Sequence, residues 1–132
     1  MFSSQNLKSV VATYTHDPAA DDQLPVFVAP NVCTIVSAKA TVANTTAAST
    51  ANYFDVGLVN KGTAGAGTIE ISSADIGGTA GWVALTPIAF TIDTDNNQLA
   101  SGECVAVDYD ETGTATFGVM TVQIDYVTGQ GA

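Results

Sequence analysis

The sequence predicts an all-β protein, and three observations lead to this fold class. Threonine, valine, alanine and glycine dominate the 132 residues, whereas long helix-forming side chains are scarce. Valine and threonine branch at Cβ and favour extended, half-buried backbone. Apolar and polar residues alternate with a period of two in several stretches, and clusters of Gly, Asn and Asp separate these stretches. We therefore expect mostly antiparallel strands and almost no helix.

The first half of the chain contains a short arm and four strand candidates. Residues 1–9 are mainly polar and are expected to form an N-terminal arm, followed by a single β-sandwich domain over residues 10–132. In the candidate over residues 32–42, the even-numbered residues from Val32 to Val42 share a face that we expect to pack on the core. In the candidate over residues 53–59, Phe54, Val56 and Leu58 share one face. The four strand candidates cover residues 10–14, 25–28, 32–42 and 53–59.

The second half predicts a hairpin, several short strands and a clear C-terminal pair. Residues 68–72 are expected to return against 53–59, a single helical turn to begin near Ser72, and Gly118 to form a bulge in the last strand. The remaining candidates are 82–85, 88–92, 103–109 and 119–127. Seven to nine short strands with turns between them indicate a β-sandwich of jelly-roll type.

The charge balance excludes two classes of partner. The chain has no arginine, three lysines and thirteen carboxylates, for a formal net charge of −10. Nucleic acids and anionic membranes are bound by basic patches, which three scattered lysines do not form. The sequence also shows no secretory signal and no apolar stretch long enough to cross a bilayer. We expect a protein that binds neither nucleic acid nor membrane.

The two cysteines, Cys33 and Cys104, are predicted to be unpaired. A chain without an export signal folds in a reducing compartment, where disulfides are rare. On their strands, neither residue lies on the face expected to carry the core valines. The sequence also lacks a CxxC pair or a Cys/His cluster, so a zinc site is not expected.

Two acidic clusters are candidate metal ligands. Residues 93–97 (Asp-Thr-Asp-Asn-Asn) resemble the start of a calcium loop, but Gln98 and Cys104 occupy the positions of the required glycine and glutamate. A hairpin turn explains this cluster without an ion. The second cluster, Asp108, Asp110 and Glu111, is interpreted as solvated carboxylates where a strand enters its turn. We expect no bound metal and no cofactor.

Catalytic groups are scarce. His16 precedes Asp17, but no nucleophile motif accompanies this pair, so we interpret His16 as a loop residue. The glycine-rich stretch 62–67 lacks the Gly-Lys-Ser/Thr ending of a phosphate-binding loop and is expected to be a surface loop. Without a combination of base, nucleophile and metal, the chain is not expected to be an enzyme, although two carboxylates alone can serve a glycosidase.

Four aromatic residues allow two interpretations. If exposed, they could form a platform on which sugar rings stack. In a small sandwich such side chains are usually part of the core, with their polar atoms bonded at its edge. We therefore expect core positions for Trp82, Tyr53, Tyr109 and Tyr126.

Two segments give the sequence a resemblance to a known class. Gly57-Leu58-Val59-Asn60 precedes a Gly-Thr-Ala-Gly loop, and the stretch 98–107 (Gln-Leu-Ala-Ser-Gly-Glu-Cys-Val-Ala-Val) precedes a Thr-Gly turn and a last strand. Over residues 32–132 this small acidic sandwich resembles head proteins of tailed bacteriophages, in particular capsid decoration or minor capsid proteins. The resemblance is one of style and carries over no functional residue.

The resemblance implies a structural role. Such a protein would bind the outer surface of a phage head as a homo-oligomer and cement neighbouring capsomers. Its partners would be the major capsid protein and copies of itself; it would be made in the host cytoplasm and located in the virion. The alternative is a carbohydrate-binding or adhesin-type module of a virion or cell surface, such as a tail or fibre module. A glycan array separates the two functions.

The N-terminal arm is the expected contact in such an assembly. Met1, Phe2 and Leu7 are apolar residues on a segment without an evident strand partner. Burying each on a neighbour would contribute roughly 1.5–3 kcal/mol, which offsets much of the backbone entropy of ordering an arm. Docking of the arm on its own sandwich is the alternative, because terminal strands often complete their own sheets.

Overall fold

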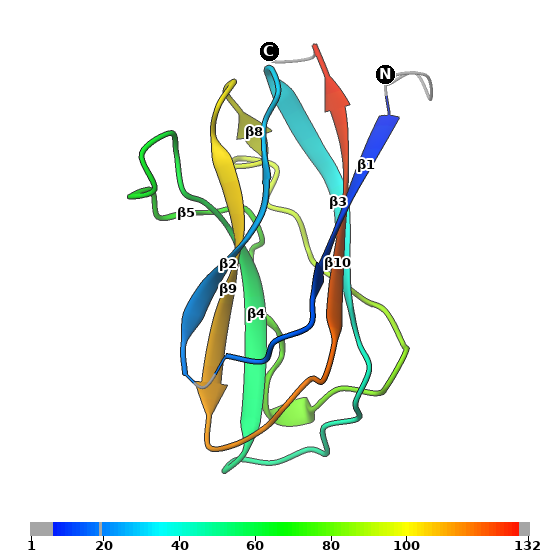
Figure 1. Ribbon diagram of the computed structural model, residues 1–132. Coiled ribbons are helices and arrows are strands. Elements are labelled where there is room, and N and C mark those ends of the chain that lie inside the picture. Colours follow the sequence, from blue (N-terminus) through cyan, green and yellow to red (C-terminus); the bar gives the residue numbers. More distant parts are fainter. Residues whose placement is uncertain (1–6, 19, 130–132) are drawn as a thin grey trace.

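A computed structural model of the chain describes residues 7–18 and 20–129. Over these residues two antiparallel sheets pack face to face, as a sandwich (Figure 1). Sheet A has the order β1-β10-β3-β7, with β8 also paired to β3, and sheet B has the order β2-β9-β4-β5, with β6 also paired to β4. The strands are β1 (Leu7–Tyr14), β2 (Asp22–Val28), β3 (Cys33–Val42), β4 (Tyr53–Asn60), β5 (Ile69–Glu70), β6 (Ile76–Gly77), β7 (Ile88–Ala89), β8 (Gln98–Leu99), β9 (Cys104–Thr112) and β10 (Met120–Thr128).

The strand order is that of a jelly roll. The first four strands alternate between the sheets, and they pair with later strands in reverse order: β1 with β10, β2 with β9, β3 with β8 and β7, and β4 with β5 and β6. Such a fold is a long hairpin rolled into two sheets. The expected all-β sandwich is therefore confirmed. In the described part of the chain, helical structure is limited to one 3₁₀ turn, η2 (Gly78–Ala80).

The core lies between the sheets and is built from alternating residues of the long strands. The faces expected for β4, β9 and β10 are confirmed. Their core residues are all 9% exposed or less: Phe54, Val56 and Leu58 from β4, Val105, Val107 and Tyr109 from β9, and Met120, Val122, Ile124 and Tyr126 from β10. Phe54 stacks on Trp82 with ring centroids 5.2 Å apart and also contacts Tyr109 and Phe117.

The expected core face of β3 is wrong in its first half. Ala38, Ala40 and Val42 are buried as expected, but before them the odd-numbered Cys33 and Ile35 are fully inside and the even-numbered Val36 is only half-buried; Thr34, at the end of the strand, is also buried. The cause is a β-bulge: Ser37 lies opposite Asp125 and Ile35 opposite Tyr126, so Val36 has no partner in β10. One extra residue in a strand exchanges the two faces beyond it.

Both cysteines are unpaired, which confirms the prediction, but the argument from their position holds for only one of them. Because of the bulge, Cys33 belongs to the core, where burial raises the pKa of its thiol. Cys104, at the start of β9, is partly exposed.

Three local expectations are wrong for reasons of backbone geometry. Gly118 lies before β10 rather than in a bulge within it; its φ is +73°, and a Cβ there would collide with Asn44. The helical turn expected at Ser72 is replaced by η2, six residues later. Residues 82–85 form no strand, because Leu85 adopts a left-handed φ of 59° and only Trp82 forms a bridge, with Thr46.

The boundary expected between the arm and the domain falls inside a strand. β1 begins at Leu7, which lies opposite Val127, so Leu7, Lys8 and Ser9 are paired with β10 rather than forming a separate arm. This is the alternative in which the terminal segment completes its own sheet, at least for these three residues. The other two predicted contact residues, Met1 and Phe2, lie outside the described residues.

Candidate functional site

The two sheets carry very different charges. Within the bounds of its strands, sheet A has two lysines, Lys8 and Lys39, and one carboxylate, Asp125. The strands of sheet B have no lysine and six carboxylates: Asp22, Asp55, Glu70, Asp108, Asp110 and Glu111. Most of the net charge of the molecule therefore lies on sheet B and in the loops, while sheet A is nearly neutral.

The densest group of acids lies on the outer face of sheet B. Asp55 in β4 is directly opposite Asp110 in β9, and Asp75 approaches both from the segment before β6. One carboxylate oxygen from each of the three lies within 4.8 Å of the others. The packing depends on Gly57, because a Cβ at that position would collide with Asp75 Oδ1. We call Asp55, Asp75 and Asp110 the aspartate cluster.

Two of the three carboxyl groups in the aspartate cluster, those of Asp55 and Asp110, are held against ionisation. The pKa of Asp55 is raised to about 7, first by burial and then by a hydrogen bond to Asp75 and the nearby negative charges. Burial and the neighbouring carboxylates also raise the pKa of Asp110 and of Glu70. Asp55 Oδ1 is buried without a hydrogen-bond partner. Like charges this close favour either a shared proton or a bound cation.

Sequence reasoning found only part of this cluster. Asp110 was expected to be a solvated carboxylate, but it is partly buried and joins Asp55 and Asp75, which the sequence did not single out. A cross-strand pair of aspartates is a detectable signal only once β4 and β9 are known to be neighbours in this register. The third residue of the predicted acidic group, Glu111, accepts a hydrogen bond from the hydroxyl of Tyr109 at 2.8 Å.

The predicted turn at 93–97 is a turn held by its own hydrogen bonds. Asp93 accepts bonds from the backbone N–H of Asp95, at 2.9 Å, and from the side-chain amide of Asn96, at 3.1 Å. The Asn97 amide is buried and donates to the carbonyl of Ile35 at 2.8 Å. The oxygen-bearing side chains of this run therefore stabilise the connection between β7 and β8 through these hydrogen bonds. The glycine-rich stretch 62–67 is likewise the loop between β4 and β5.

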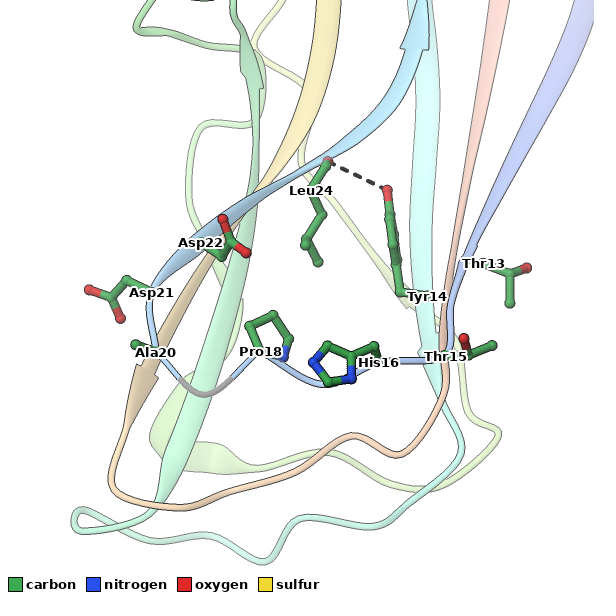
Figure 2. A pocket seen from close by; sticks show the side chains of 9 residues that line it. All are labelled: Thr13, Tyr14, Thr15, His16, Pro18, Ala20, Asp21, Asp22 and Leu24. Atoms are coloured by element: carbon green, nitrogen blue, oxygen red, sulfur yellow. Dashed lines mark hydrogen bonds between the residues drawn. The ribbon is translucent and has the colours of Figure 1, made fainter.

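An open groove lies where β1 passes to β2 (Figure 2). Its volume is about 710 Å³, and its lining combines apolar and acidic groups. Tyr14 stands at one side, with its hydroxyl donating to the Pro25 carbonyl at 2.7 Å, and burial raises the pKa of this hydroxyl. His16 and Pro18 line the groove from the loop, and Asp21 and Asp22 lie across from Tyr14 (Figure 2). Groups of this kind suit a small polar ligand with an apolar side.

The core interpretation of the aromatic residues is confirmed for three of the four. Trp82, Tyr109 and Tyr126 are 2%, 0% and 9% exposed, respectively, and Tyr53 is only half-buried. The Trp82 indole N–H donates to the Phe54 carbonyl at 3.2 Å.

The His16–Asp17 pair lies in the loop that borders the groove. Asp17 accepts a hydrogen bond from the hydroxyl of the buried Tyr109 at 3.3 Å, which ties this loop to β9. His16 itself is exposed in the loop, as predicted.

The two long edge strands differ in how they are protected. β2, at the edge of sheet B, contains Pro25, begins with Asp22 and has a bulge between Pro25 and Phe27. β1, at the edge of sheet A, pairs with β10 at every position from Leu7 to Tyr14 without a bulge or proline. On its outer face Leu7 and Val11 are 48% and 57% exposed. Proline, bulges and charge are the usual means by which proteins block an edge.

Among the described residues, no helix has the length and apolar character needed to cross a membrane.

Comparison with known proteins identifies a likeness in fold. No protein-family model matches the sequence, and neither does any curated protein. Among solved structures, the chain is similar to a chain of the "Cyanophage Pam1 capsid asymmetric unit", with a TM-score of 0.58 and 12% sequence identity. The match covers 92% of this chain and 84% of that one. At this identity the likeness is one of fold, and it extends over nearly the whole sandwich.

Proposed function

We propose that the protein is a structural component of a bacteriophage virion that decorates the capsid. The observation that carries the proposal is the fold likeness to a cyanophage capsid chain over 92% of the sequence. Jelly-roll sandwiches are a common architecture of capsid proteins. The acidic, phage-like sequence adds to this likeness. In this role the protein acts by binding and not by catalysis, with the major capsid protein and its own copies as partners.

The charge difference between the sheets supports an orientation on the shell. A surface that docks on a protein shell loses its water, and unpaired charges at such an interface are costly. Sheet A is nearly neutral, and its one carboxylate, Asp125, already accepts hydrogen bonds from Ser9 and Ser37 at 2.6 and 2.9 Å. Sheet B carries six carboxylates. Sheet A therefore faces the shell in this proposal, and sheet B faces the solvent.

Binding to empty heads tests the function. Purified protein is mixed with heads, lacking this chain, of the phage that encodes it, and the mixture is separated on a density gradient. We expect the protein to sediment with the heads at a fixed ratio to the major capsid protein. A Lys39→Glu variant, which places a new negative charge in the middle of sheet A, should bind less. A Lys61→Glu variant, with the same charge change in a loop, is the control. Failure of the unchanged protein to bind contradicts the proposal.

The groove gives a second candidate function, carbohydrate binding. Tyr14, His16 and Pro18 offer apolar surface, and Asp21 and Asp22 offer acceptors for sugar hydroxyls, within a cavity of about 710 Å³. Jelly rolls also occur as lectin domains. A glycan array distinguishes the two functions: selective binding that an Asp22→Ala variant loses supports the lectin, and head binding without glycan binding supports the capsid protein.

A further inference from the structure

We propose that the β1 edge of sheet A is a self-association surface, on which β1 of a second copy pairs antiparallel about a two-fold axis at Val11. The two sheets A would then continue into one another. This inference goes beyond the proposed function, because it concerns the purified protein in solution and stands whether or not the protein binds a capsid.

The backbone of β1 provides the capacity for pairing. In an antiparallel edge strand, alternate residues direct their N–H and C=O groups away from the existing partner. Across the described residues, β1 has β10 on one side and no strand on the other. Eight consecutive residues, 7–14, keep a continuous register with β10, so the outward groups form a regular row. A long regular edge is a template for another strand unless it is blocked.

β1 lacks the protection that β2, the other long edge strand, has. β2 is interrupted by Pro25, bends at a bulge and begins with Asp22. In β1 the one charged residue is Lys8, near its start, and the outer face presents the exposed side chains of Leu7 and Val11. Of the two long edge strands of the molecule, β2 is therefore blocked and β1 is open. This contrast indicates that the open edge is retained for a contact.

Charge favours a second copy as the occupant. Two molecules with a net charge of −10 repel unless they meet where acids are few. β1 contains no carboxylate, and Asp125, the carboxylate on the adjacent β10, is held by hydrogen bonds from Ser9 and Ser37. The opposite sheet carries six acids, which the two-fold axis at β1 keeps at a distance. Identical strands can meet at this edge with little repulsion.

The symmetry fixes which residues meet. Residues directly opposite each other in an antiparallel pair lie on the same face of the sheet. With the axis at Val11, the two Val11 side chains face each other, Ser9 meets Thr13, and Lys8 meets Tyr14. No two like charges are opposed in this register. The contact covers Val11, which is 57% exposed in the single chain.

Sedimentation equilibrium over a wide range of concentrations tests the proposal, with a matched pair of variants. Val11 in β1 and Val28 in β2 are 57% and 58% exposed. Val11→Lys places two lysines face to face on the axis. We therefore expect the dissociation constant of its dimer to be at least about tenfold higher than that of the unchanged protein. Val28→Lys should dimerise like the unchanged protein. Circular dichroism checks that both variants remain folded.

Cysteine cross-linking provides a readout that does not depend on weakening the dimer. In a chain with Cys104→Ser, mild oxidation of Val11→Cys should give a covalent dimer, whereas Val28→Cys should not. A monomer at every concentration, an equal response of the two lysine variants, or cross-linking only through position 28 overturns the proposal. A monomeric protein whose Val11→Lys variant loses head binding would assign the edge to a strand of a different protein, and would also overturn it.

Discussion

Sheet A and sheet B have equivalent strand orders but opposite surfaces. Their inner faces are both apolar and contribute to one core, in which Leu58 of sheet B and Ile124 of sheet A are fully buried. Their outer faces differ: sheet B holds the aspartate cluster, and sheet A holds a single hydrogen-bonded carboxylate. The comparison shows that the fold constrains what lies between the sheets and leaves each outer surface free for a separate role.

The largest effect is expected where the two sheets meet. Phe54→Ala removes a ring that stacks on Trp82 and contacts Tyr109 and Phe117, all of them buried. We expect a loss of about 3–5 kcal/mol in the free energy of unfolding, from lost burial and the cavity that remains. Urea denaturation measures it. Val28→Ala, on an exposed side chain, should change the value by no more than about 0.5 kcal/mol. Equal effects would contradict the core described above.

On sheet B, stability should decrease as the pH rises. The pKa of Asp55 is about 7 in the folded protein, above its ordinary value of 3.8. The folded state therefore holds this proton more tightly than the unfolded state. The stabilisation is fully present below the unfolded pKa and is lost as the pH rises through 7. Thermal melts from pH 4 to pH 8 should show this decline. A melting temperature that rises steadily over this range would contradict it.

Asp55→Asn isolates the aspartate cluster from the rest of the acidic surface. It keeps the shape of the side chain and removes one of three close carboxylates. We expect a gain of about 1 kcal/mol at pH 8, after discounting for partial exposure, and a flatter pH profile. The control is Asp95→Asn, which removes the same charge from an exposed turn. If both variants gain equally, the effect comes from net charge and not from the cluster.

On sheet A, the dependence on pH has the opposite sign and is smaller. A hydrogen bond from Ser9 is the main cause that lowers the pKa of Asp125, with further bonds from Gln123 and Ser37. This stabilisation is present above the unfolded pKa and is lost as the pH falls through the lowered value. Ser9→Ala should cost about 0.5 kcal/mol or less at pH 7, because the pair is exposed. The cost should decrease as the pH falls below the ordinary pKa of 3.8, which acid melts can measure.

How well the sequence predicted the fold depended on whether a strand was regular. β4, β9 and β10 have uninterrupted alternation, and their core faces were predicted correctly. In β3 the unpaired Val36 exchanges the faces, and no residue type marks that position. Residues 82–85 have the composition of a strand, but tertiary hydrogen bonds, such as Leu85 N–H to the Val42 carbonyl at 2.8 Å, hold them as a loop.

The candidate sites were harder to predict because they depend on pairing between distant strands. Asp55 and Asp110 meet only through the register of β4 with β9. The groove likewise depends on the approach of Tyr14 to β2. The sequence predicted the acidity of the molecule and the scarcity of catalytic groups, but not on which sheet the acids would gather.

The pairing of the first strand with the last has a mechanical consequence. Leu7 lies opposite Val127, so the outer ends of β1 and β10 lie at the same end of the sandwich (Figure 1). A force that pulls these two ends apart acts on the hydrogen bonds one pair at a time, as when a zipper is opened. A force applied along the strands would instead load all the pairs together. The sandwich should therefore open at low force when it is stretched between its own ends.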